Sequence, residues 1–253
     1  MYSITELHEI MTKEQILENF DPSQPGLADA TIFGLPFSAE QSEIIVIPVP
    51  WEVTVSYGSG ASKGPDAVLD ASFQVDLNHQ EFPELWKLGI YIDKPAKELK
   101  KKSKKFKKQA APIIKALESG MILDHHPSLM KDLEEINYAC SDMVEAVREQ
   151  TLNWMNKGKK VVLLGGDHST PLGYYQALAT KYDNFGILHL DAHMDLRIAY
   201  EGFTYSHASI MYNALHIPQI SKIVQVGIRD FCEQEVEVAL SDRVLVHTDS
   251  DLK

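Results

Sequence analysis

The stretch Gly186-Ile187-Leu188-His189-Leu190-Asp191-Ala192-His193-Met194-Asp195 joins a mostly apolar run to a cluster of metal-ligand side chains. The run has the length of a strand, and its near-continuous apolar character is typical of strands buried on both faces. Parallel sheets place their ligand-binding loops at the carboxyl ends of the strands. The sequence therefore predicts a buried parallel strand that ends in a functional site at Asp191, His193 and Asp195.

Similar apolar runs occur at residues 44–49, 161–164, 223–226 and 244–246. Longer segments separate them, and residues 133–157 carry apolar side chains at three- and four-residue spacing, which indicates a helix. Strands that alternate with helices predict an α/β fold with a parallel sheet covered on both sides.

One segment differs in charge from the rest of the chain. Residues 97–108 contain eight lysines and one glutamate, a local charge of +7, whereas the net charge of the chain is −12. We interpret it as a lysine-rich insertion, either a solvated helix or a mobile loop, with a patch for an anionic partner as the alternative. No Gly/Ser-rich or Pro-rich linker marks a boundary, so we expect a single domain over residues 1–253.

The composition is that of an acidic globular protein. The 253 residues are 44% hydrophobic, with 24 basic against 36 acidic side chains. This balance argues against non-specific binding of nucleic acid or of a membrane surface and favours a small or cationic partner. No apolar run is long enough to span a bilayer, residues 1–6 lack the features of a signal peptide, and only Cys140 and Cys232 are present. We therefore expect a cytoplasmic protein with reduced thiols.

Asp191, His193 and Asp195 alternate with Ala192 and Met194 after the strand. In an extended segment the three side chains leave on one face and can converge. Two carboxylates and an imidazole are costly to bury together unless a cation neutralises them. Oxygen and imidazole donors without a thiolate favour Mn²⁺ and leave Zn²⁺, Fe²⁺ and Co²⁺ open.

A second candidate segment, residues 165–170, follows the apolar run at 161–164. Its two glycines allow a tight turn, and Ser169 or Thr170 is predicted to cap a helix that Pro171 begins. By itself His168 is either a ligand or a hydrogen-bonded packing residue.

Two further histidine segments are less specific. His207 lies in a loop after the candidate metal segment, where it is either a proton-transfer residue or a surface histidine. Asp124-His125-His126 resembles a metal site in composition, but no strand precedes it, so we interpret it as a loop.

Taken together, these motifs resemble the binuclear manganese ureohydrolases, the arginase and agmatinase family. The resemblance rests on Gly-Gly-Asp-His-Ser at 165–169, Asp-Ala-His-Met-Asp at 191–195, the His207 loop, the glycine-rich loop at 54–67 and the strand at 226–230. Residues 195–208 resemble prokaryotic agmatinases more than arginases. The resemblance implies a three-layer α/β/α fold with a predominantly parallel sheet, and a homo-oligomer, either a trimer or a hexamer.

The resemblance also implies roles for the candidate residues. His168 and Asp195 would be terminal ligands of one Mn²⁺, His193 a ligand of the second, and Asp191 a bridge between the two. A metal-bridging hydroxide would attack the guanidinium carbon, with His207 and Asp195 as the catalytic residues and His207 delivering a proton to the departing amine.

The implied substrate is a linear cationic guanidine, with agmatine converted to putrescine and urea as the first expectation. Arginine, other guanidino acids and formiminoglutamate are alternatives, as are a noncatalytic metal-binding relative and an amide deacetylase. Arg197 either meets a substrate carboxylate or serves as a structural ion-pair partner.

The sequence departs from the family pattern near its C-terminus. The family completes its site with an Asp-x-Asp pair on a later strand, and the candidate here, Asp249-Ser250-Asp251, lacks the Asp-Pro that usually follows. We interpret it as a turn or helix start. The expectation is a domain that is incomplete at its C-terminal end, or else a naturally shortened, noncatalytic relative.

Overall fold

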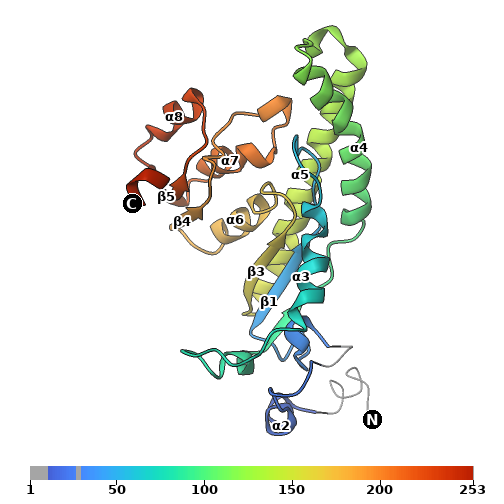
Figure 1. The fold of residues 1–253 in the computed structure, drawn as a ribbon, viewed down its shortest axis with the longest axis vertical. Coiled ribbons are helices and arrows are strands. Elements are labelled where there is room, and N and C mark those ends of the chain that lie inside the picture. The colour runs from blue at the N-terminus through green and yellow to red at the C-terminus, as the bar shows by residue number, and fades with distance from the viewer. Residues whose placement is uncertain (1–10, 27–29, 253) are drawn as a thin grey trace.

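Two three-stranded parallel sheets form the frame of the protein in a computed structural model that describes residues 11–26 and 30–252 (Figure 1). The first sheet has the order β2-β1-β3 and the second β4-β5-β6, and all the strand pairs are parallel. The strands are β1 Ile44–Val49, β2 Ile90–Ile92, β3 Lys160–Gly165, β4 Phe185–Leu190, β5 Ile220–Ile228 and β6 Val244–Thr248. The predicted parallel α/β fold is confirmed, and the short strand β2 was not predicted.

The helices are α2 Lys13–Asn19, which precedes the first strand, and α3 Gly64–Ser72, α4 Leu99–Glu118, α5 Pro127–Asn156, α6 Leu172–Ala179, α7 Ile210–Leu215 and α8 Glu233–Ala239, which lie between strands. Helix α5 covers the predicted helix except Lys157, which is its C-cap, and it begins earlier, at Pro127, because proline suits the first turn of a helix. Short 3₁₀ turns cover Ile32–Gly34, Ala61–Lys63, Leu85–Leu88, Leu123–His125, Tyr200–Gly202, His207–Ser209 and Asp249–Leu252.

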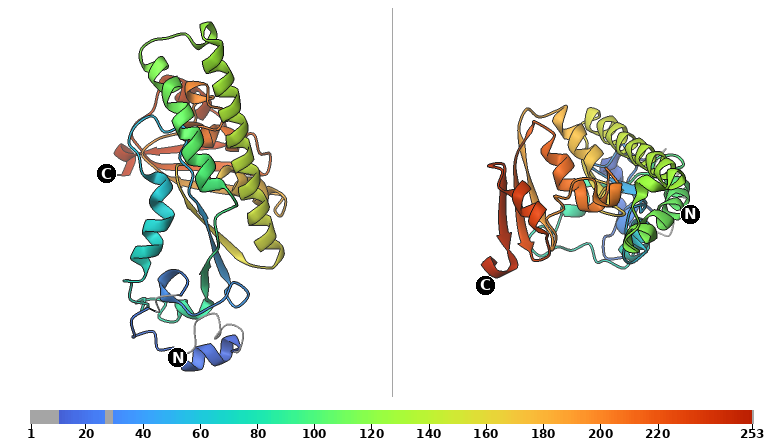
Figure 2. Two further views of the ribbon diagram at one scale, coloured as in Figure 1. Left: turned by 90° about the vertical axis from the view of Figure 1, so that its right-hand side faces the viewer. Right: turned by 90° about the horizontal axis from the view of Figure 1, so that it is seen from above.

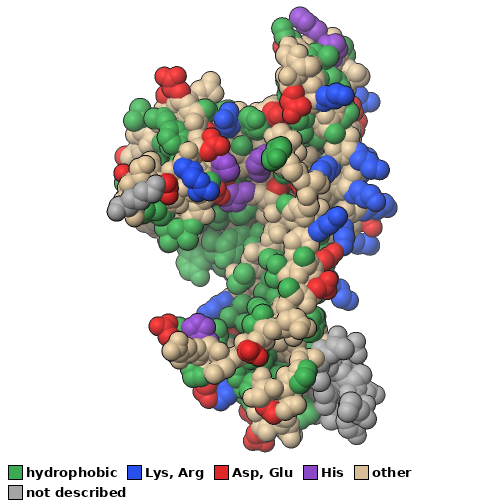
Figure 3. Space-filling model, in the orientation of Figure 1, with side chains coloured by type: hydrophobic (Ala, Val, Ile, Leu, Met, Phe, Trp, Pro, Cys, Tyr) green, Lys and Arg blue, Asp and Glu red, His purple; other side chains and the backbone are tan. Residues whose placement is uncertain are grey.

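The lysine-rich segment lies mostly in α4, which packs beside α5 as a helical hairpin (Figure 2). Ala110 and Ile113 are fully buried on its inner side. Blue basic side chains line the right-hand side of the molecule in Figure 3, where α4 lies in Figure 1. Lys100 pairs with Asp66, and Lys102 pairs with Asp142. The segment is therefore a solvated helix and not a mobile loop.

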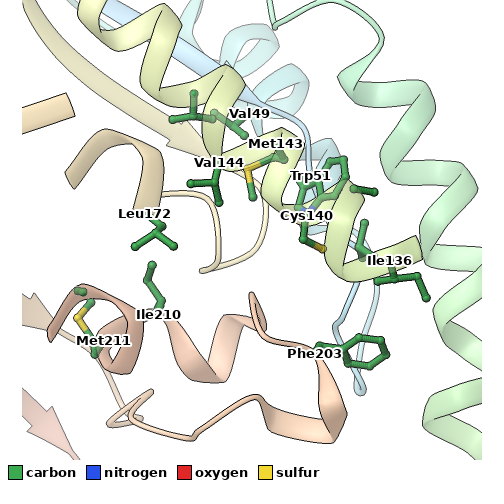
Figure 4. Packing of buried hydrophobic residues seen from close by; sticks show 14 of the residues in the cluster. Val49, Trp51, Ile136, Cys140, Met143, Val144, Leu172, Phe203, Ile210 and Met211 are labelled. Carbon is green, nitrogen blue, oxygen red and sulfur yellow. The ribbon is translucent and has the colours of Figure 1, made fainter. Parts of the chain in front are cut away.

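One buried hydrophobic cluster joins the two sheets (Figure 4). It combines Val49 of β1, Met143 of α5 and Leu172 of α6 with Ile210 and Met211 of α7. Both sheets are thus held against one body of helices, and the carboxyl ends of β3 and β4 are brought together.

The N-terminal start, residues 1–6, falls outside the residues described, and so does the expectation drawn from it. In the described part of the chain, no helix combines the length and apolarity that crossing a bilayer requires. Cys140 and Cys232 are both free thiols, as expected.

Candidate metal centre

The loop after β3 carries His168 and is fixed against the loop after β1. The Gly166 N–H donates to Val49 O at 3.1 Å, and the Asp167 N–H donates to Trp51 O at 2.8 Å. A Cβ on Gly166 would lie 2.0 Å from Trp51 O, so the backbones approach too closely for any other residue. The second glycine of the motif therefore sets the position from which His168 projects.

Asp167 anchors this loop from inside. Its buried carboxylate accepts hydrogen bonds from Ser169 N at 2.9 Å, Ser169 Oγ at 2.5 Å and Val53 N at 3.3 Å. Burial raises the pKa of Asp167, and the bonds from Ser169 oppose that rise. The sequence interpretation gave Asp167 no role, although it adjoins His168.

The predicted helix cap after this loop was wrong. Helix α6 begins at Leu172, and Pro171 is its N-cap without a side-chain hydrogen bond. Ser169 is held by Asp167, and the Thr170 hydroxyl donates to Asp167 O at 3.0 Å. Both candidate cap hydroxyls therefore stabilise the His168 loop and not the helix.

The segment after β4 continues its pairing with β5 before it turns away. The Asp191 N–H donates to Val226 O at 3.1 Å, and an isolated bridge joins His193 to Asp230. Asp195 then adopts a left-handed backbone with φ +53°, and its carbonyl accepts from Met211 N at 3.0 Å. The predicted alternation onto one face was therefore wrong at Asp195, where the chain leaves the extended conformation under the control of α7.

This turn brings four side chains together. His168, His189, Asp191 and Asp195 offer ligand atoms that all lie within 4.8 Å of one another, and they are the sole such group in residues 11–26 and 30–252. His168 Nδ1 lies 2.6 Å from Asp195 Oδ2 and 3.4 Å from Asp191 Oδ2. Ligands at bond lengths of about 2.1 Å from one ion sit about 3 Å apart, so this spacing suits a divalent cation.

His193 approaches Asp191 from the other side. Its Nδ1 lies 3.4 Å from Asp191 Oδ1, and its Nε2 lies 3.6 Å from Asp230 Oδ2. Asp191 therefore turns one oxygen toward His168 and the other toward His193. Asp230 was not predicted as a site residue, although it follows β5 and the strand-end rule that directed attention to Asp191 applies to it equally.

The electrostatics favour the charged forms of His168 and Asp191 and the neutral form of His189. Burial alone lowers the pKa of His168, but its hydrogen bond to Asp195 and the charges of Asp195 and Asp191 outweigh that effect and raise the pKa. Burial raises the pKa of Asp191, but the N–H of His193 and the nearby imidazoles outweigh it and lower that pKa. Burial and the neighbouring His168 lower the pKa of His189, which favours its neutral form.

A hollow of about 170 Å³ opens beside the cluster. Its lining includes His193, Asp195, Arg197, His207 and Asp230, so the structure brings His207 and Arg197 to the same place as two of the predicted ligands. The remaining lining residues are Ser56, Tyr200, Ala208, Phe231 and Glu235.

Arg197 is engaged within the protein. Its Nε lies 3.6 Å from Glu235 Oε2, and its guanidinium lies 4.8 Å from the centre of the Tyr200 ring. The structural ion-pair alternative for Arg197 is therefore realised, while the residue still lines the hollow.

The remaining acidic and histidine motifs have local structural roles. Asp251 accepts hydrogen bonds from Thr248 N and Thr248 Oγ1, both at 2.7 Å, in a 3₁₀ turn after β6. Asp124 and His125 lie in a short turn between α4 and α5. Neither segment belongs to the described metal-ligand group, as the turn and loop interpretations expected.

Comparison with known proteins identifies the family. Residues 42–253 match the sequence profile of the arginase family. The chain belongs to the arginase family. This arginase-family chain is 30% identical over 203 residues to an N(1)-aminopropylagmatine ureohydrolase of Thermus thermophilus, covering 79% of this chain and 55% of that protein. It is 26% identical to an agmatinase of Bacillus anthracis, covering 80% of this chain and 57% of that protein.

Solved structures show the arginase-like fold. The agmatine ureohydrolase of Thermoplasma volcanium superposes with a TM-score of 0.62 at 20% identity, covering 94% of this arginase-family chain and 66% of that chain. The chain spans a little over half the length of the curated relatives that it matches.

Proposed function

We propose that the chain forms the metal centre of a binuclear metal-dependent hydrolase that cleaves a linear guanidine, with agmatine converted to putrescine and urea. The observation that carries this proposal is the position of Asp191 between two histidines. One of its oxygens lies 3.4 Å from His168 Nδ1 and the other lies 3.4 Å from His193 Nδ1. A carboxylate so placed suits two cations side by side, and the arginase family depends on a binuclear metal centre.

The donor chemistry fits a pair of divalent ions, for which we propose Mn²⁺. His168 and Asp195 would hold one ion, His193 the other, and Asp191 both. Imidazole nitrogens and carboxylate oxygens without a thiolate suit a borderline to hard cation. When bound, the ions supply Lewis-acid activation of water for attack on the guanidinium carbon.

The chain's own residues would complete the reaction. His207 lines the same hollow as His193 and Asp195. We propose that the guanidinium of the substrate enters this hollow, which would place its carbon near His207. A protonated imidazole beside the reacting carbon can give a proton to the departing amine. His207 is therefore the proposed proton donor, and the carboxylates of Asp191 and Asp195 offset the charge of a cationic substrate.

The surroundings of Arg197 favour agmatine over arginine. Its guanidinium already faces Glu235 and Tyr200, so it is poorly placed to receive a substrate carboxylate. Asp230 and Glu235 line the same hollow and would attract a cationic amine tail. An aminopropyl-extended agmatine, the substrate named for the Thermus relative, has a guanidinium and one more cationic amine than agmatine, and it is the second candidate.

The deciding experiment measures urea release and bound Mn²⁺ together in the purified chain. We expect urea from agmatine, two Mn²⁺ per chain, and loss of both urea and one ion in His193→Ala. The matched control is His216→Ala, because His216 is exposed at the end of α7 and bonds to Tyr212 O. Two bound ions without urea in folded protein would indicate a noncatalytic metal-binding relative and overturn the activity.

A further inference from the structure

His189 is the one member of the metal-ligand group that the motifs did not predict. It lies inside β4, two residues before Asp191, and is 4% exposed. Its Nε2 lies 3.4 Å from Asp191 Oδ2 and has no hydrogen-bond partner among the described residues. Its ring centre is 5.1 Å from that of His168. Position alone leaves it either a metal ligand or a group that acts on the ligands.

The neighbouring strand decides between these roles through Gln225. Gln225 pairs with His189 in the β4–β5 register, and its side-chain Nε2 lies 3.0 Å from His189 Nδ1. The same Nε2 lies 2.6 Å from Met194 O. A carbonyl oxygen only accepts hydrogen bonds, so the atom facing Met194 has to be the amide nitrogen. The reverse orientation would set two acceptors against each other, so the amide is fixed.

The fixed amide then determines which nitrogen of His189 carries the proton. One N–H of Gln225 goes to Met194 O and the other goes to His189 Nδ1, which has to accept it. An imidazole with an accepting Nδ1 is neutral and carries its hydrogen on Nε2. Nε2 is thus a donor that faces Asp191 Oδ2, and it has no lone pair to offer an ion.

We propose that His189 is a positioning residue for Asp191, held as the Nε2–H tautomer by Gln225, and not a metal ligand. This inference rests on the proposed function, in which Asp191 lies between two ions. The backbone N–H of His193 bonds Asp191 Oδ1 at 2.9 Å, and the Nε2–H of His189 faces Asp191 Oδ2 at 3.4 Å, where a small shift of either side chain would make a second orienting hydrogen bond. Donors that orient a ligand commonly change metal affinity about 10- to 100-fold.

The first test reads the tautomer directly. We expect ¹⁵N NMR of the ion-free protein to show a protonated Nε2 and a bare Nδ1 for His189, with His189→Gln used to assign the signal. Gln225→Leu should release the lock and let the other tautomer appear. A protonated Nδ1 in the wild-type protein, or an unchanged tautomer in Gln225→Leu, would overturn the proposal.

The second test measures Mn²⁺ affinity by electron paramagnetic resonance, with folding checked by circular dichroism. His189→Leu should weaken binding about 10- to 100-fold, and His189→Gln should recover part of the loss because its amide keeps an N–H donor. His216→Leu is the control and should bind as the wild type does. Equal losses in the Leu and Gln variants would make His189 a ligand, and no loss in either would make it a packing residue.

The two proposals fail in different measurements. The tautomer of His189 is read without ions or substrate, so a protein that releases no urea can still show the locked imidazole. Conversely, urea release together with a protonated Nδ1 would keep the hydrolase and overturn the role of His189.

Discussion

The two sheets are built from similar apolar runs but differ in how they are covered. In the first sheet β1 is buried along nearly its whole length, and helices α3 and α5 contact the sheet. In the second sheet, β4 leaves Leu188 and Leu190 67% and 71% exposed on one face. Parallel sheets are ordinarily covered on both faces. The central strand β1 of the first sheet is thus covered on both faces, whereas the edge strand β4 of the second sheet is covered on one face only.

The metal-ligand side chains are divided just as unequally. The first sheet contributes His168, and the second contributes Asp191, Asp195 and the neighbouring His189. The geometry of the site therefore depends on how the two sheets are held together. We call the contact between α5 and residues 202–204, which follow β4, the seam. Polar bonds help to close that seam, since Asn137 of α5 donates to Gly202 O at 3.1 Å and accepts from Thr204 N at 2.9 Å.

The largest expected effect comes from breaking the seam at Phe203. This side chain is fully buried beyond β4 and belongs to the same cluster as Ile136 of α5 (Figure 4). Phe203→Ala should lower the free energy of unfolding by about 3–5 kcal/mol, because it leaves a cavity between the parts that carry the two sheets. Urea denaturation measures the loss, with Phe203→Leu as the milder control. A loss below about 1 kcal/mol would show that the seam is held elsewhere.

A smaller loss is expected at Gly173, where α6 packs against α5. A Cβ there would lie 2.1 Å from Val144 O, so Gly173→Ala has to push the helices apart. We expect a loss of about 1–3 kcal/mol in the free energy of unfolding. Alanine normally stabilises a helix relative to glycine, so the sign of the change separates close packing from helix propensity. Gln176→Ala on the same helix is the control, and a gain in stability for Gly173→Ala would contradict the close approach.

The sequence predicted the parts of the site that are local and missed those that depend on pairing. Strand runs and motifs located His168, Asp191 and Asp195 because parallel strands place functional residues at their ends. His189 looked like part of an apolar run, and only its register opposite Gln225 reveals that it reaches the cluster. The turn at Asp195 was unpredictable for the same reason, since its left-handed backbone is held by α7 from a distant segment.

The fold shows the same division. Long apolar runs located the strands β1, β3, β4, β5 and β6, whereas the three-residue β2 has too little sequence to form a pattern. The separation into two sheets is also absent from the sequence pattern, because runs at residues 161–164 and 186–190 look alike. Strand pairing is decided by contacts between distant segments, and no single apolar run encodes those contacts.

Polar substitutions on the exposed face of β4 should change dye binding but not the free energy of unfolding. Leu188→Thr with Leu190→Thr keeps residues that suit a strand and removes exposed apolar surface. We expect the free energy of unfolding to stay within about 0.5 kcal/mol and the binding of an apolar fluorescent dye to fall. The control is Ile187→Thr on the covered face of β4, which should destabilise the protein. A large loss of stability in the double variant would show that this face is covered in solution.

The smallest expected effect compares the two thiols, Cys140 in α5 beside the first sheet and Cys232 before α8 beside the second. Cys140 is fully buried in α5, and burial raises its pKa, so it lacks both access and the reactive thiolate. Cys232 is half-buried before α8, in the second half of the chain. A thiol reagent should therefore label Cys232 in the native protein and Cys140 only after unfolding. The control is Cys232→Ser, which should abolish labelling of the native protein. Raising the pH from 7 to 9 should leave Cys140 unreactive, because burial raises the pKa of its thiol and keeps the reagent away from the sulfur. Labelling of Cys140 at a similar rate would mean that the first half opens as readily as the second, which would remove the difference in burial between them.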